Sequence, residues 1–205
     1  MQKLTRRSMI FVLVSARIAD AQTGVVWRKN SSYRALAPES IITPEEIMKA
    51  GLGSYTDEEI KLLFEKLPSP KPWHIRGQIA LVALKGYVLV PVPPAAISKS
   101  TELWLAIRLD AIPDSFNETW EEQLKRTNEH QRVPTAEEVT WWVQVLWATR
   151  HKLPFHHIYI RTSSPSLDGG HVCLGGNAAG ILKIKHCPDA MRSVDIGIAP
   201  AVKRP

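Results

Sequence analysis

Three histidines, a cysteine and a Gly-rich turn lie in the stretch from Leu153 to Asn177 of this 205-residue chain. A cysteine thiolate is a strong nucleophile, and nearby positive charge or hydrogen-bond donors lower the pKa of the thiol. Cys173 follows His171 by two residues, so on an extended strand their side chains share one face. Backbone N–H groups of Gly175 and Gly176 could then hold an oxyanion. The spacing indicates either a nucleophilic cysteine or a small, buried packing residue.

The same region offers a second chemistry, because imidazole and thiolate groups are the usual ligands of zinc. The candidate ligands are His156, His157, His171, Cys173, His186 and Cys187. None of the usual Cys-x-x-Cys or His-x₃-His spacings is present, and neighbouring residues of a strand point to opposite faces. A zinc-binding domain is therefore only an alternative, and the main interpretation includes no metal or cofactor.

The segment Pro165–Gly175, PSLDGGHVCLG, resembles the active-site segment of ubiquitin-conjugating-type (UBC-fold) proteins. It is similar in particular to the prokaryotic branch that includes PRTRC system protein B, whose members carry an Asp-Gly-x-Val-Cys-Leu-Gly motif. The preceding Leu153–Ile160 is similar to the strand that carries a Tyr-Pro-Phe segment in that family. The resemblance is confined mainly to residues 153–177.

This resemblance implies thioester chemistry. Cys173 would accept a ubiquitin-like protein from its activating enzyme and transfer it to an amine, while Asp168 shapes the loop and His171 tunes the thiol. The chain departs from the family at Ser164-Pro165-Ser166, which stands where the family has His-Pro-Asn. The side-chain amide that steadies the oxyanion is thus missing, and Asn177 is a candidate to replace it. Either backbone donors take over this task, or the chain is an inactive relative.

Composition supports a different function, a noncatalytic binding protein with a basic surface. The formal net charge is +6, which suits an anionic partner such as nucleic acid, but no long Lys/Arg block occurs. Exposed tryptophans, with Trp27, Trp73 and Trp120 as candidates, could contact nucleic acid or another protein. Two cysteines are too few for a disulfide framework. We therefore expect two reduced thiols in a cytoplasmic protein.

The N-terminus allows two interpretations. Arg6-Arg7 before an apolar run is typical of a twin-arginine signal, but Arg17 and Asp20 shorten that run. The favoured interpretation is a β-hairpin over residues 9–28, with its turn at 20–24. The apolar run is too short to cross a membrane, which takes about 20 residues. No membrane partner is predicted.

Helix starts are the clearest structural signals. Thr43 and Thr56 each precede a Glu by three residues, which is the pattern of a capping box. Residues 134–147 combine such a start with apolar residues at helical spacing, although their β-branched and aromatic content also allows a strand. The polar residues 117–131 are compatible with a helix. We expect helices in these four places.

The predicted strands are residues 78–90, 102–109, 155–160, 171–174 and 180–186. The first is almost continuously apolar and is expected at the centre of a sheet. Gly175-Gly176 is expected to end the fourth strand, and the C-terminal tail is expected to be poorly ordered. The predicted fold is α+β, an antiparallel sheet flanked by helices and UBC-like. An N-terminal hairpin and helical portion (1–72) and the sheet with the Cys173 loop (73–205) are expected to form one compact unit.

Overall fold

The computed structural model describes residues 41–66, 86–100, 102–176 and 181–202. The predicted N-terminal hairpin, the boundary at residues 72 and 73, and Asn177 lie outside these residues, as do Trp27 and Trp73. Within them the fold is α+β, which confirms the predicted class. The finer likeness to the UBC fold stays a prediction.

Each α-helix of the described residues begins with a capping box. The helices are α2 (Pro44–Lys49), α3 (Asp57–Glu65), α5 (Trp120–Leu124) and α6 (Ala136–Arg150). The capping boxes pair Thr43 with Glu46, Thr56 with Glu59, Thr119 with Glu122, and Thr135 with Glu138. The helix prediction for 134–147 is confirmed over its strand alternative. The polar stretch 117–131 forms the short α5 with turns and irregular backbone around it, and its last residue, Gln131, begins a strand.

The first sheet has the strand order β1-β2-β8-β3. Its strands are β1 (Tyr87–Pro91), β2 (Trp104–Arg108), β3 (Gln131–Arg132) and β8 (Ala201–Val202). Short 3₁₀ turns follow β1 and β2, at η2 (Pro94–Ala96) and η3 (Pro113–Ser115). Residues 78–85 of the apolar run that was expected to be central lie outside the described residues, and among the described strands β1 stands first and not in the centre. Its residues are buried nonetheless: Ile41 bridges to Leu89 along its outer edge, and Trp141 and Trp142 donate to the carbonyls of Pro91 and Val88.

The second sheet has the order β6-β5-β4-β7. Its strands are β4 (Tyr159–Pro165), β5 (His171–Gly176), β6 (Leu182–Cys187) and β7 (Ile196–Gly197). The pairs β4–β5 and β5–β6 are antiparallel, and β4–β7 is parallel. This sheet carries the residues that the sequence marks for chemistry.

Two strand boundaries in this sheet differ from the prediction. The strand predicted at 155–160 is β4, which begins at Tyr159 and not at Phe155. Phe155 and His157 have φ angles of 61° and 62°, which are not those of an extended strand. Phe155 instead packs against Trp142, with ring centroids 5.9 Å apart. The next strand continues through Gly175, where a Cβ would lie 2.7 Å from the Tyr159 ring. Glycine is thus required there by packing, and it does not end the strand.

The described C-terminal residues, 196–202, are ordered, contrary to prediction. Ile196, Ile198 and Ala201 are almost completely buried. β7 pairs within the second sheet, and the chain then continues to β8. β8 lies between β2 and β3 and connects them in the first sheet. Burial of these apolar residues holds the tail in place despite its prolines.

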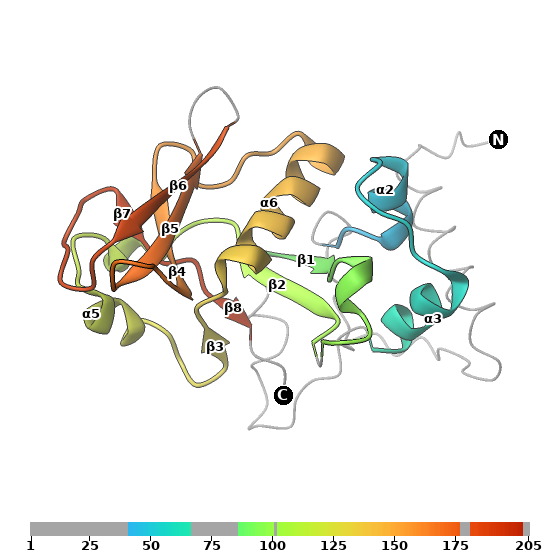
Figure 1. Cartoon of the computed structure of the whole chain (residues 1–205), viewed down its shortest axis with the longest axis horizontal. Helices are drawn as coiled ribbons and strands as arrows, with labels where there is room; N and C mark the ends of the chain where they lie inside the picture. The colour runs from blue at the N-terminus through green and yellow to red at the C-terminus, as the bar shows by residue number, and fades with distance from the viewer. Residues whose placement is uncertain (1–40, 67–85, 101, 177–180, 203–205) are drawn as a thin grey trace, which may run out of the picture.

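Helix α6 joins the two sheets, as Figure 1 shows. It packs on β2 and on β4 and β5, and Trp142 at its centre donates from Nε1 to the Val88 carbonyl at 3.0 Å. Ile47 of α2 and Leu63 of α3 belong to the same apolar core. Among the described helices, none combines the length and the apolar character needed to cross a membrane.

The central position of Trp142 gives a first prediction. Trp142→Phe removes the hydrogen bond to the Val88 carbonyl and leaves a cavity in the core. We expect it to lower the free energy of unfolding by about 2–3 kcal/mol, measured by urea denaturation followed by circular dichroism. Trp147→Phe is the control, because that side chain is 46% exposed. Equal effects of the two substitutions would contradict the assigned core.

Candidate functional site

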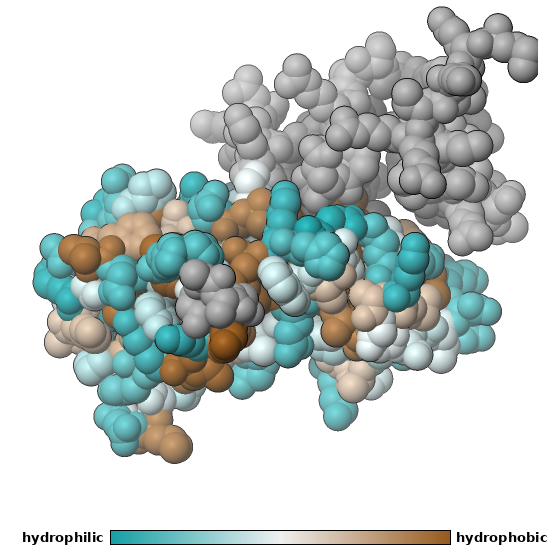
Figure 2. All heavy atoms as spheres, turned by 90° about the horizontal axis from the view of Figure 1, so that it is seen from above, coloured by the Kyte–Doolittle hydropathy of each residue, from teal (hydrophilic) through white to brown (hydrophobic). Residues whose placement is uncertain are grey.

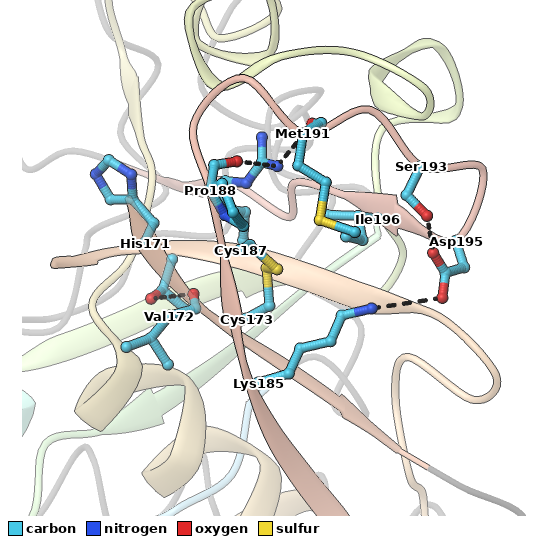
Figure 3. The surroundings of a disulfide bond; sticks show 12 residues. His171, Val172, Cys173, Lys185, Cys187, Pro188, Met191, Ser193, Asp195 and Ile196 are labelled. Atoms are coloured by element: carbon cyan, nitrogen blue, oxygen red, sulfur yellow. Dashed lines mark hydrogen bonds and ion pairs between the residues drawn. A yellow bond between two sulfur atoms is a disulfide. The ribbon is translucent and has the colours of Figure 1, made fainter. Parts of the chain in front are cut away.

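The two cysteines of the chain form a disulfide between β5 and β6 (Figure 3). Cys173 lies opposite Lys185 in the ladder and Cys187 opposite His171, so the cysteines are diagonal neighbours on one face of the sheet. Their Cα atoms are 6.1 Å apart, and neither residue has exposed surface. The prediction of two reduced thiols is wrong for this structure. The disulfide fastens β6 to the rest of the sheet.

This arrangement offers no thiolate at Cys173, since its sulfur is bonded and buried. The expected backbone donors are also engaged: Gly176 donates to the Phe155 carbonyl at 3.2 Å, and Gly175 lies within the ladders that join β5 to both neighbours. Asp168 lies exposed on the turn between β4 and β5. The geometry does not support a nucleophilic role for Cys173, and its catalytic assignment stays a prediction.

His171 has a partner that the sequence did not reveal. Its Nδ1 lies 2.6 Å from Oδ1 of Asp189, and its ring centroid lies 4.0 Å from that of Trp120. His171 does share a face with Cys173, as predicted from the spacing. The imidazole, however, connects the loop after β6 to α5. Its contacts therefore serve to hold that loop, which comprises residues 188–195.

Arg161 is the charged side chain buried beneath this loop, at 1% exposure and opposite Cys173 in the ladder. It donates to Gln123 Oε1 at 2.8 Å and to the Met191 carbonyl at 3.1 Å. A longer contact, 3.4 Å, reaches the Pro188 carbonyl (Figure 3). Burial lowers the pKa of Arg161, and the charge of Asp189 opposes that effect. Three acceptors on two segments thus fix the loop over the disulfide.

Gln123 completes this buried polar group. The side chain is fully buried and donates from Nε2 to the Ser115 carbonyl at 2.7 Å and to the Ile196 carbonyl at 3.1 Å. Because its Oε1 accepts from Arg161, one amide connects α5, η3, β7 and β4. The sequence signal for this group is an arginine that directly follows Tyr159 and Ile160 in β4.

Two ion pairs close the rim of the loop. Lys185 Nζ lies 3.6 Å from Asp195 (Figure 3). It also lies 3.8 Å from the centroid of the Tyr159 ring. Donation from the Ser193 hydroxyl, and then the charge of Lys185, lower the pKa of Asp195. Arg192 lies 2.6 Å from Glu122 at the start of α5. The described residues thus tether the loop at both its beginning and its end.

The structure also tests the metal alternative. Nowhere in the described part of the chain do three or more metal-binding side chains gather. Cys173 and Cys187 are bonded to each other and are not available as ligands. The rings of His156 and His157 are neighbours, with centroids 3.9 Å apart, but no third candidate ligand joins them among the described residues. The zinc interpretation is not supported.

Comparisons of the chain with protein-family models, with curated proteins and with solved structures found no match. The resemblance to ubiquitin-conjugating-type proteins is therefore neither supported nor contradicted by known relatives.

The basic charge of the chain does not lie on the described part. The described residues hold 14 of the 26 Lys and Arg but 18 of the 20 Asp and Glu, which gives them a formal net charge of −4. Seen from above in Figure 2, the described part is mostly hydrophilic, with separate groups of apolar atoms. The predicted basic surface is thus absent from this part as a whole.

Our second prediction concerns the disulfide. Replacing both cysteines, as in Cys173→Ala with Cys187→Ala, should lower the free energy of unfolding by about 2–4 kcal/mol, because the bond closes a loop in the unfolded chain. Urea denaturation measures this value. Iodoacetamide should label the urea-unfolded protein only after reduction. Labelling of the unfolded protein without reduction would contradict the bond.

The rim of the loop gives a third prediction. Donation from the Thr119 backbone N–H, and then the guanidinium of Arg192, lower the pKa of Glu122 to about 2. Arg192→Ala should raise that pKa, although not to the ordinary value, because the Thr119 donor remains. Carboxyl ¹³C NMR titration measures the change, and Lys61→Ala serves as control. An unchanged pKa in the Arg192 variant would contradict the pairing.

Proposed function

We propose that this chain is a noncatalytic binding protein and that the outer edge of β6 is its docking strand. The observation that carries this proposal is a six-residue strand at the end of a sheet, fastened to its neighbour by a buried disulfide. β6 stands first in the order β6-β5-β4-β7, and no described strand pairs with its outer side. A free strand edge is a template for pairing with another chain.

The hydrogen bonds of Gly176 identify which groups of β6 face outward. Its N–H donates to the Phe155 carbonyl and its carbonyl accepts from the His157 N–H, so both point away from β6. Backbone groups alternate in direction along an antiparallel ladder. Gly176 lies opposite Leu182, so the backbone groups of Leu182 also point away from the partner strand. Ile184 and His186 follow Leu182 at every second position and lie in pairs of the same kind. The N–H and carbonyl groups of these three residues therefore point outward.

The remaining residues of β6 point their backbone groups inward. Lys183, Lys185 and Cys187 lie opposite Gly175, Cys173 and His171, in the hydrogen-bonded pairs of the ladder. Cys187, which forms the disulfide, is one of these three residues. An added strand can thus bond to β6 without disturbing the β5–β6 ladder.

Nucleic acid is a less suitable partner for the described part. A protein that binds the phosphate backbone presents clustered positive charge. The described residues carry a net charge of −4, and several of their arginines are paired with carboxylates. Those pairs join Arg126 to Glu118, Arg132 to Glu102 and Glu138, Arg150 to Glu46, and Arg192 to Glu122.

Ubiquitin-like conjugation stays a prediction that rests on the resemblance of residues 153–177. It needs a reduced and accessible Cys173, together with a ubiquitin-like protein and its activating enzyme as partners. In place of the cytoplasmic location expected from the sequence, we propose a compartment in which disulfides persist. The buried Cys173–Cys187 bond supports that proposal, because such bonds are rare in reducing compartments.

Peptide display tests the proposed function. The full-length oxidised protein is immobilised, and a library of random peptides is selected on it. We expect enriched sequences whose synthetic peptides bind saturably in fluorescence anisotropy. Failure of the library to yield any saturable binder would overturn the proposal.

A nucleic-acid control uses the same assay with single-stranded and double-stranded DNA at low and high salt. We expect weak or no binding at low salt. Tight binding that falls steeply with salt, without any peptide binder, would favour the nucleic-acid alternative.

A further inference from the structure

We infer that β6 accepts an extended peptide in which apolar and acidic residues alternate, and that this peptide adds a fifth strand to the second sheet. The inference rests on the proposed function and names the class of partner. Strand addition uses main-chain hydrogen bonds for affinity, while the side chains of alternate residues determine specificity. The two faces of β6 differ in chemistry, so the side chains they accept differ as well.

One face of β6 carries the apolar Leu182 and Ile184 beside the exposed His186, and it is incompletely covered. Ile184 lies opposite Leu174, which is fully buried in the core that α6 covers. Ile184 itself is 69% exposed, and Leu182 on the same face is half-buried. A strand paired to β6 would place every second side chain on the face that carries Leu182 and Ile184. Apolar residues at those positions would extend the core layer past its present edge.

The other face of β6 is basic. Lys183 and Lys185 lie there, and neither β5 (HVCLGG) nor β6 (LKIKHC) contains a carboxylate. Lys185 is paired with Asp195 from the loop after β6. Lys183 is exposed, and the ion pairs of the described residues do not include it. An acidic residue of an added strand would lie beside Lys183, where opposite charges across a strand pair are favourable.

A second copy of this chain is a poorer occupant of the same edge. Two β6 strands related by a two-fold axis through Ile184 would place Lys183 of each copy opposite Lys185 of the other. Like charges directly opposite each other destabilise a strand pair. Lysines on an edge strand are a common means of preventing such self-association. The charge of β6 therefore selects a partner with carboxylates.

The disulfide prepares this edge for binding. Cys187 is the last residue of β6, and its bond to Cys173 holds the strand against β5 before a partner arrives. The loop over the bond is itself fixed by Arg161 and His171. A docking strand that is already ordered loses less conformational freedom on binding. Affinity should therefore fall when the bond is reduced.

Synthetic peptides of about seven residues, a typical strand length, test the inference on the full-length oxidised protein by fluorescence anisotropy. One peptide alternates valine and glutamate, a second alternates valine and lysine, and a third has the composition of the first in scrambled order. We expect the valine–glutamate peptide to bind at least about tenfold more tightly than either other peptide. Equal affinities for all three would overturn the inference.

Substitutions locate the site. Lys183→Glu should reverse the preference, so that the valine–lysine peptide binds more tightly than the valine–glutamate peptide. Ile184→Asp should weaken the valine–glutamate peptide about tenfold or more. Lys61→Glu on α3, at the opposite end of the molecule from β6 in Figure 1, is the matched control and should change nothing. Circular dichroism confirms that each variant is folded.

The outcomes separate the inference from the proposed function. If library selection yields binders that Lys183→Glu and Ile184→Asp do not affect, the site lies elsewhere and only the inference falls. If neither the library nor the valine–glutamate peptide gives saturable binding, both fall. Dimerisation through β6, detected by sedimentation and abolished by Ile184→Asp, would show that the edge takes a second copy and would also overturn the inference.

Discussion

The bond between Cys173 and Cys187 is the constraint on which the second sheet depends. It joins the last residue of β6 to the middle of β5, and the loop that follows it turns back over the same face. Arg161 reaches the carbonyls of that loop from β4, and His171 meets Asp189 from β5. The bond, the buried guanidinium and the imidazole thus belong to one assembly. The sulfur of Cys173 is buried and bonded within this assembly, which does not favour a role as a nucleophile.

The two faces of the second sheet have different surroundings. One face, with Leu174, is covered by α6 and belongs to the core that Trp142 organises. The opposite face carries the disulfide and the buried Arg161, which donates to Gln123 and to backbone carbonyls of the loop. At β6, however, Ile184 is 69% exposed and Lys183 is exposed, and no described strand pairs with the outer side of this strand. That is the physical reason for assigning function to an edge and not to a cleft.

Local signals in the sequence predicted local structure well. A threonine three residues before a glutamate fixed the start of α2, α3 and α6, because a capping box satisfies donors within one turn. The alternation of a strand correctly placed His171 and Cys173 on one face. The α+β class followed from the same periodicities.

Features that depend on distant residues were not predictable in this way. The disulfide requires the register that sets Cys187 opposite His171, and no local pattern gives that register. Glycine at 175 suggested the end of a strand, whereas the Tyr159 ring requires it within one. Asp189 and Gln123 have partners 18 and 38 residues away in the chain. The bonded state of Cys173 was missed for the same reason, because its partner Cys187 lies on another strand.

Amide hydrogen exchange, measured by NMR on the free oxidised protein, tests the central claim most directly. If β6 is hydrogen-bonded to β5 and its outer edge is free, the amides of Lys183, Lys185 and Cys187 are protected from exchange. The amides of Leu182, Ile184 and His186 then exchange rapidly. Alternation of this kind along one strand would establish a free, preordered edge. Uniform protection of all six amides would mean that the edge is already occupied. Uniformly rapid exchange would mean that the disulfide does not hold the strand, and either result would contradict the account.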